Sequence, residues 1–99
     1  MFTTARPVIF VLAAVALAEG DPSHALELVD QALVLYQDRS DPIELGRTLV
    51  LRSSIRLQQG DAEAARRDLI EAQEIFERIG AVPDLQMVRR HQTLIEAPE

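Results

Sequence analysis

The sequence predicts an all-α protein in which antiparallel helix hairpins stack as a short right-handed solenoid of five helices. The first observation is an internal repeat, because Gly20-Asp21 recurs 40 residues later as Gly60-Asp61. The second is that apolar residues follow both pairs at spacings of three and four, the period of an amphipathic helix. The third is that small residues recur with the same offset. These are Ala13 and Ser53, Ala25 and Ala65, and Ala32 and Ala72. A repeat of this length decides the architecture before any single residue does.

Composition limits the classes of protein that the chain can represent. Its 99 residues suit one domain, and a hydrophobic content of 47% is too high for a disordered chain. The net charge of −6 argues against a nucleic-acid partner, which requires a basic surface. The absence of cysteine excludes disulfides, thiolate catalysis and cysteine-based metal sites.

The first helix is predicted over residues 4–19 and ends at Gly20, which tolerates the left-handed conformation of a helix terminus. Residues 1–18 also resemble a signal peptide, since an apolar stretch leads to small residues at its end. We favour the helix, because the 40-residue register requires one here, and we expect a cytoplasmic protein. The alternative is a secreted or periplasmic protein that loses these residues. The dozen apolar residues are too few to span a bilayer, which requires about 20.

The second helix is predicted to begin with Asp21 as its N-cap and Pro22 in its first turn, where proline sacrifices no hydrogen bond. Its inward residues follow the helical period. They are Ala25, Leu28, Val29, Ala32, Leu35 and Tyr36. Residues 39–42 form the turn that follows, since Pro42 bars continuation of the helix.

The third helix is predicted from Pro42 to Gln59 and ends at Gly60. Asp61 caps the fourth, whose inward residues are Ala65, Leu69, Ala72, Phe76 and Ile79. Gly80 ends that helix, and Pro83-Asp84 opens a fifth with Leu85, Val88 and Ile95 inward. The small residues let the two helices of each hairpin approach closely. The expected organisation is therefore repeat 1 over 5–41, repeat 2 over 42–82 and a capping helix over 83–96.

This pattern resembles the tetratricopeptide repeat family. The first repeat matches at Ile9, Leu12, Ala13, Gly20, Asp21, Ala25, Val29 and Ala32. The second matches at Leu49, Ser53, Gly60, Asp61, Ala65, Leu69 and Ala72. The family's usual period is 34 residues, and a period of 40 resembles the arrays of large bacterial signalling and transcriptional regulators. The resemblance implies a non-enzymatic protein-interaction module. Alternatively, the chain is the C-terminal repeat segment of such a regulator or an exported helical repeat protein.

The resemblance also implies that the first helix of each hairpin lines a concave groove that binds a peptide or helix. The expected lining is Phe10, Ala14, Leu17, Arg47, Val50, Ser54, Gln58, Met87, Arg90 and Leu94. This mixture of apolar and basic side chains suits an acidic amphipathic partner.

Other polar residues are predicted to have ordinary structural roles. Arg52 and Arg56 lie four residues apart on one helix face, where they could bind an anionic partner or pair within the chain. We favour pairing, with Glu27, Asp30 or Asp68 on the flanking helices as partners. His24 and His91 lack ligand partners at helical spacing, so no metal site is expected. The sequence also predicts no cofactor and no catalytic residues.

The first helix is apolar on every side from Pro7 to Ala18, and such a helix requires burial all round. One of its sides is expected to pack on the second helix and another on the second hairpin, which leaves a third side uncovered. The last helix instead has a polar outer side, formed by Gln86, Arg89, Arg90, Gln92 and Thr93. Three explanations for the uncovered side remain open: self-association, a docked partner, or further repeats upstream.

Overall fold

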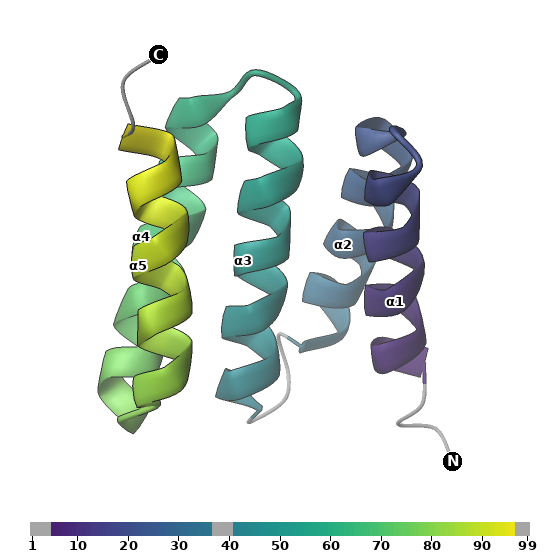
Figure 1. Cartoon of the computed structure of the whole chain (residues 1–99). Helices are drawn as coiled ribbons and strands as arrows, with labels where there is room; N and C mark the ends of the chain where they lie inside the picture. Colours follow the sequence, from purple (N-terminus) through teal and green to yellow (C-terminus); the bar gives the residue numbers. More distant parts are fainter. Residues whose placement is uncertain (1–4, 37–40, 97–99) are drawn as a thin grey trace.

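The computed structural model describes residues 5–36 and 41–96, and these residues form five α-helices joined by short turns (Figure 1). The helices are α1 (Ala5–Ala18), α2 (Pro22–Tyr36), α3 (Pro42–Gln58), α4 (Ala62–Ile79) and α5 (Val82–Glu96). No strand occurs in the described ranges, so the predicted all-α class is confirmed. The helix bounds fall within one or two residues of those expected from the sequence.

The helices pack mainly against their neighbours in the chain. Contacts are most extensive between α3 and α4 and between α1 and α2, and α2 also packs on α3 and α4 on α5. Two further contacts join alternate helices, α1 with α3 and α3 with α5. In Figure 1 these three helices stand in the nearer layer, with α2 and α4 behind them. The helices α1, α3 and α5 therefore lie in one layer of the structure.

The two Gly-Asp turns have the same geometry. Gly20 and Gly60 adopt φ values of +83° and +85°, a left-handed conformation that a residue with a Cβ adopts only with strain. Their N–H groups bond the carbonyls of Leu17 and Leu57, both at 3.0 Å. The Asp21 carboxylate accepts the N–H of His24 at 3.2 Å, and the Asp61 carboxylate accepts that of Ala64 at 3.1 Å. The two predicted Gly-Asp turns and their caps are therefore confirmed. The turn predicted over residues 39–42 includes residues 39 and 40, which lie outside the described part of the structure.

The repeated small residues lie between the helices of each pair, as predicted. Each is at most 2% exposed. They are Ala13, Ala25 and Ala32 in the first pair, and Ser53, Ala65 and Ala72 in the second. Ser53 is polar, but its hydroxyl donates to the carbonyl of Val50 at 2.6 Å, so burial leaves it with a partner. These short side chains allow the close approach of α1 to α2 and of α3 to α4.

The core consists of two apolar clusters. The first contains Ala13, Ala16, Ala25, Val29 and Ile55. The second contains Leu49, Val50, Leu69, Ala72, Ile75, Phe76 and Val88. Leu33 of α2 packs against both clusters and thereby joins the two helix pairs.

Two residues that the sequence placed inward are exposed instead. Leu35 is 43% exposed and Ile79 is 41% exposed. Ile79 is the last residue of α4. Leu35 lies on the side of α2 that no described helix covers. The side chain of Tyr36 lies outside the described part of the structure.

A glycine inside α3 permits a close contact that the sequence did not predict. Gly46 is buried, and a Cβ added there would overlap the ring of Phe76. Phe76 is itself fully buried. The glycine therefore provides the space in α3 that the largest core side chain of α4 occupies.

Candidate interaction surfaces

The predicted groove residues lie on the face formed by α1, α3 and α5, with one correction. Arg47, Gln58, Arg90 and Leu94 are exposed, whereas Phe10, Ala14, Leu17, Ser54 and Met87 are half-buried. Val50 is only 4% exposed and belongs to the core cluster that includes Val88 of α5. Its assignment to a partner-binding groove is therefore wrong, because α5 packs against α3 and closes over it. We call six of the other residues, Phe10, Arg47, Ser54, Gln58, Met87 and Arg90, the three-helix face.

One arginine of this face is held by the chain itself. Arg47 Nε donates to Asp84 Oδ1 at 2.9 Å, and Nη1 lies 3.7 Å from Glu44 Oε1. The hydrogen bond with Asp84 is the largest cause of the raised pKa of Arg47, although burial opposes it. Because Asp84 is only 8% exposed, this contact fastens the start of α5 to α3. The sequence placed Asp84 in a helix first turn and gave no sign of this partner.

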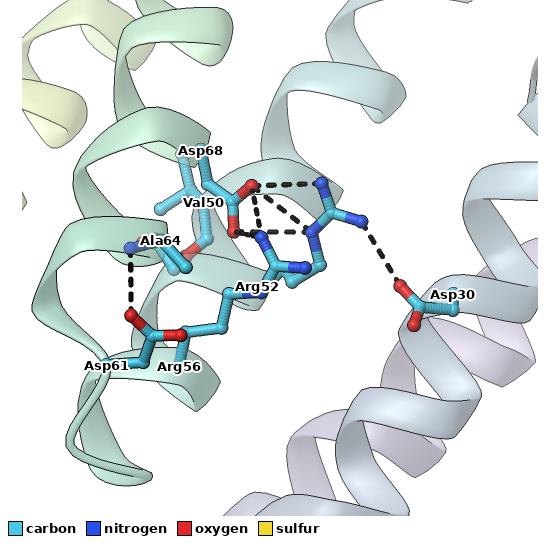
Figure 2. Close-up of polar contacts among 8 residues, drawn as sticks. Asp30, Val50, Arg52, Arg56, Asp61, Ala64 and Asp68 are labelled. Atoms are coloured by element: carbon cyan, nitrogen blue, oxygen red, sulfur yellow. Dashed lines mark hydrogen bonds and ion pairs between the residues drawn. The ribbon is translucent and has the colours of Figure 1, made fainter.

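The most buried charged group of the described residues belongs to a network that spans three helices (Figure 2). The Asp68 side chain on α4 is 3% exposed and accepts hydrogen bonds from two arginines of α3. Arg52 Nη2 lies 2.9 Å from Asp68 Oδ1, and Arg56 Nη1 lies 3.1 Å from the same oxygen. Arg52 Nη1 also reaches Asp30 Oδ1 of α2 at 3.1 Å. The network therefore fixes α2 and α4 to α3.

These contacts keep the arginine charges satisfied within the chain. Burial of the Arg52 guanidinium opposes its charge, but the hydrogen bonds and charges of Asp68 and Asp30 outweigh this and raise the pKa of Arg52. Arg52 thus stays protonated throughout the physiological range. Pairing with Asp30 and Asp68 was the favoured hypothesis, and both pairs are present. Glu27, the third candidate partner, lies 3.7 Å from His24 Nδ1 instead.

The equivalent positions of the first helix pair carry no such network. Moving back by 40 residues, Arg52 corresponds to Leu12, Arg56 to Ala16 and Asp68 to Leu28. The first pair therefore has only apolar side chains where the second has three charges.

An apolar stripe on α1 is exposed, as expected for the uncovered third side of this helix. Val8, Val11, Leu12 and Val15 follow the i, i+3, i+4, i+7 spacing of one helix face, and each is between 47% and 57% exposed. Leu35 of α2 is exposed as well. We call these five residues the open face.

The histidines make only local contacts. His91 Nδ1 lies 2.9 Å from the carbonyl of Met87, one turn earlier in α5. Within residues 5–36 and 41–96, no three acidic or histidine side chains cluster as metal ligands would. No helix in these ranges is long and apolar enough to cross a membrane.

Comparison with known proteins returned no matching family model, no matching curated protein and no matching solved structure. The resemblance to tetratricopeptide repeats therefore stays a prediction, carried by the repeated residues alone.

Proposed function

We propose that the chain is a non-enzymatic protein-interaction module, built as a short right-handed solenoid of the tetratricopeptide type, whose three-helix face binds an amphipathic peptide or helix. The packing of α1 on α3 and of α3 on α5 is the observation that supports this function. It arranges the first helix of each pair side by side, so a single extended ligand can contact all three. Repeat arrays commonly bind partners along such a surface.

The chemistry of the face favours an acidic ligand with apolar anchors. Arg90 and Gln58 are exposed on this face. Phe10 and Met87 are half-buried and supply apolar contact area between the polar groups. In a chain of net charge −6, the exposed guanidinium of Arg90 would also orient an acidic ligand toward this face.

Peptides selected from a displayed random library on the immobilised intact chain test this function. We expect acidic amphipathic sequences, and we expect Arg90→Glu to weaken their binding about tenfold by placing like charges together. Arg67→Glu is the matched control, because Arg67 is equally an exposed arginine but lies on α4. A selection without binders, or binders equally sensitive to both substitutions, would contradict the proposal.

A further inference from the structure

We propose that the open face is a second docking site, which takes an amphipathic helix of a partner protein running antiparallel to α1. The helix would present an uncharged apolar side to Val8, Val11, Leu12, Val15 and Leu35. This site is separate from the three-helix face, and its occupant is indicated by the internal repeat.

The repeat register identifies the surface that corresponds to the open face. Adding 40 residues takes its members to Thr48, Leu51, Arg52, Ile55 and Ile75. Thr48, Ile55 and Ile75 are at most 9% exposed, whereas their counterparts are among the most exposed apolar residues of the described chain. The same helix faces are therefore covered in the second pair and uncovered in the first.

In the second pair, α2 is the element that covers the α3 part of this surface. It packs on α3, and its Asp30 bonds Arg52. Leu33 of α2 packs against both core clusters, one of which includes Ile55 and the other Ile75. Asp30 and Leu33 are three residues apart on one helix face, so α2 covers the surface with a mixed acidic and apolar side. The occupant of the open face should accordingly be a helix in the place of α2.

The open face differs from its counterpart in a way that specifies the occupant. Leu12 stands where Arg52 bonds Asp30, so a carboxylate at that position of the partner would be buried against leucine without a hydrogen bond. The partner is therefore expected to carry an apolar residue there. Glu19 follows Val15 by four residues on the same face and lies beside the N-terminus of an antiparallel helix, whose dipole favours a negative charge.

A second copy of the chain fits this face less well. The side of α2 that would match it is already occupied by α3, and α4 is covered by α5. The outer side of α5 is polar, with Gln86, Arg89, Arg90 and Thr93 exposed.

Two synthetic peptides test the proposal directly. Both have the sequence of residues 21–36, and one carries Asp30→Leu. Fluorescence anisotropy would measure their binding to the intact chain, and light scattering would measure its mass. We expect a monomer that binds the Asp30→Leu peptide at least about tenfold more tightly than the native peptide, because the unpaired carboxylate is removed.

Substitutions in the chain locate the binding. Val11→Glu should weaken binding of the Asp30→Leu peptide at least about tenfold, and Val15→Asn provides a second, uncharged variant of the same stripe. Ile70→Glu is the matched control, since Ile70 is 51% exposed on α4 and Val11 is 57% exposed on α1. Circular dichroism should show the same helix content for all three variants. Arg90→Glu should leave peptide binding unchanged, which separates this site from the three-helix face.

Three results would overturn the proposal. A dimeric chain that becomes monomeric with Val11→Glu would assign the open face to a second copy. Absence of binding by either peptide would mean that a helix in the place of α2 is not recognised there. Equal peptide affinity for the Val11→Glu and Ile70→Glu variants would place the binding elsewhere on the molecule.

Discussion

The two helix pairs share one framework but differ in the residues that face their neighbours. Their turns have the same glycine conformation and the same aspartate cap, and their small residues are buried at equivalent positions. The second pair has a network of Arg52, Arg56 and Asp68, whereas the first has Leu12, Ala16 and Leu28 at the same places. The difference shows that small residues and turns determine helix spacing, while the positions between them determine which neighbour can pack there.

Removing the carboxylate from the network should produce the largest loss of stability. Asp68→Ala leaves two arginines facing each other in a poorly hydrated site, and we expect it to lower the free energy of unfolding by about 3 kcal/mol. This value is at the lower end of the usual loss of stability for breaking a buried ion pair, because the side chains of Arg52 and Arg56 are still 19% and 25% exposed. Leu28→Ala, at the equivalent place in the first pair, should cost about 1 kcal/mol because Leu28 is half-buried. Urea unfolding measures both, and equal losses would contradict a structural role for the network.

Filling the space at Gly46 tests the tighter packing of the second pair. Gly46→Ala should lower stability by about 2 kcal/mol, because the new methyl group overlaps the buried ring of Phe76. The higher helix propensity of alanine offsets only part of this loss. Thermal unfolding would measure the change, and Phe76→Leu in the same chain should recover part of it by removing the ring. A Gly46→Ala variant at least as stable as the parent would show that α3 and α4 can move apart.

Replacing the whole network should have the smallest effect. The triple variant Arg52→Leu, Arg56→Ala and Asp68→Leu gives the second pair the residues of the first. We expect its free energy of unfolding to stay within about 1 kcal/mol of the parent, because apolar packing replaces the ion pairs together with their desolvation. Asp30 then loses its partner but stays half-exposed to water. A loss as large as that of Asp68→Ala, measured in the same urea titration, would show that the ion pairs are irreplaceable at this site.

The helices, their ends and their close contacts could be predicted because each depends on local chemistry. The carboxylates of Asp21 and Asp61 cap their helices by accepting the backbone N–H three residues later in the chain. Gly20 and Gly60 supply the left-handed conformation of the turns. Each of these features is encoded within a few residues, and the repeat encodes it twice. The pairing of Arg52 with Asp30 and Asp68 was also predictable, because the helix register placed oppositely charged residues on adjoining faces.

The features that the sequence did not predict depend on contacts between residues that are far apart in the chain. Val50 follows the same face of α3 as Arg47 and Ser54, and only the position of α5 decides that it is buried. Asp84 pairs with a residue 37 positions away, which no local pattern specifies. In the sequence, Gly46 is only a residue of low helix propensity inside a predicted helix. The structure shows why it is there, because the ring of Phe76 occupies the space beside it. The three-helix face was therefore predicted only in outline, and its polar contacts were not.

The Arg52–Asp30 contact has a consequence for how the chain reaches its native state. A sequence with two similar halves can fold incorrectly if α2 associates with the wrong helix face, and misassembly of this kind is typical of repeat proteins. The correct site offers Asp30 a guanidinium 3.1 Å away, whereas the equivalent site on α1 offers Leu12. An ion pair that adds little to stability can thus distinguish the correct docking site of α2 on α3 from the similar site on α1. The two halves of the chain differ at this position although their helices and turns are alike.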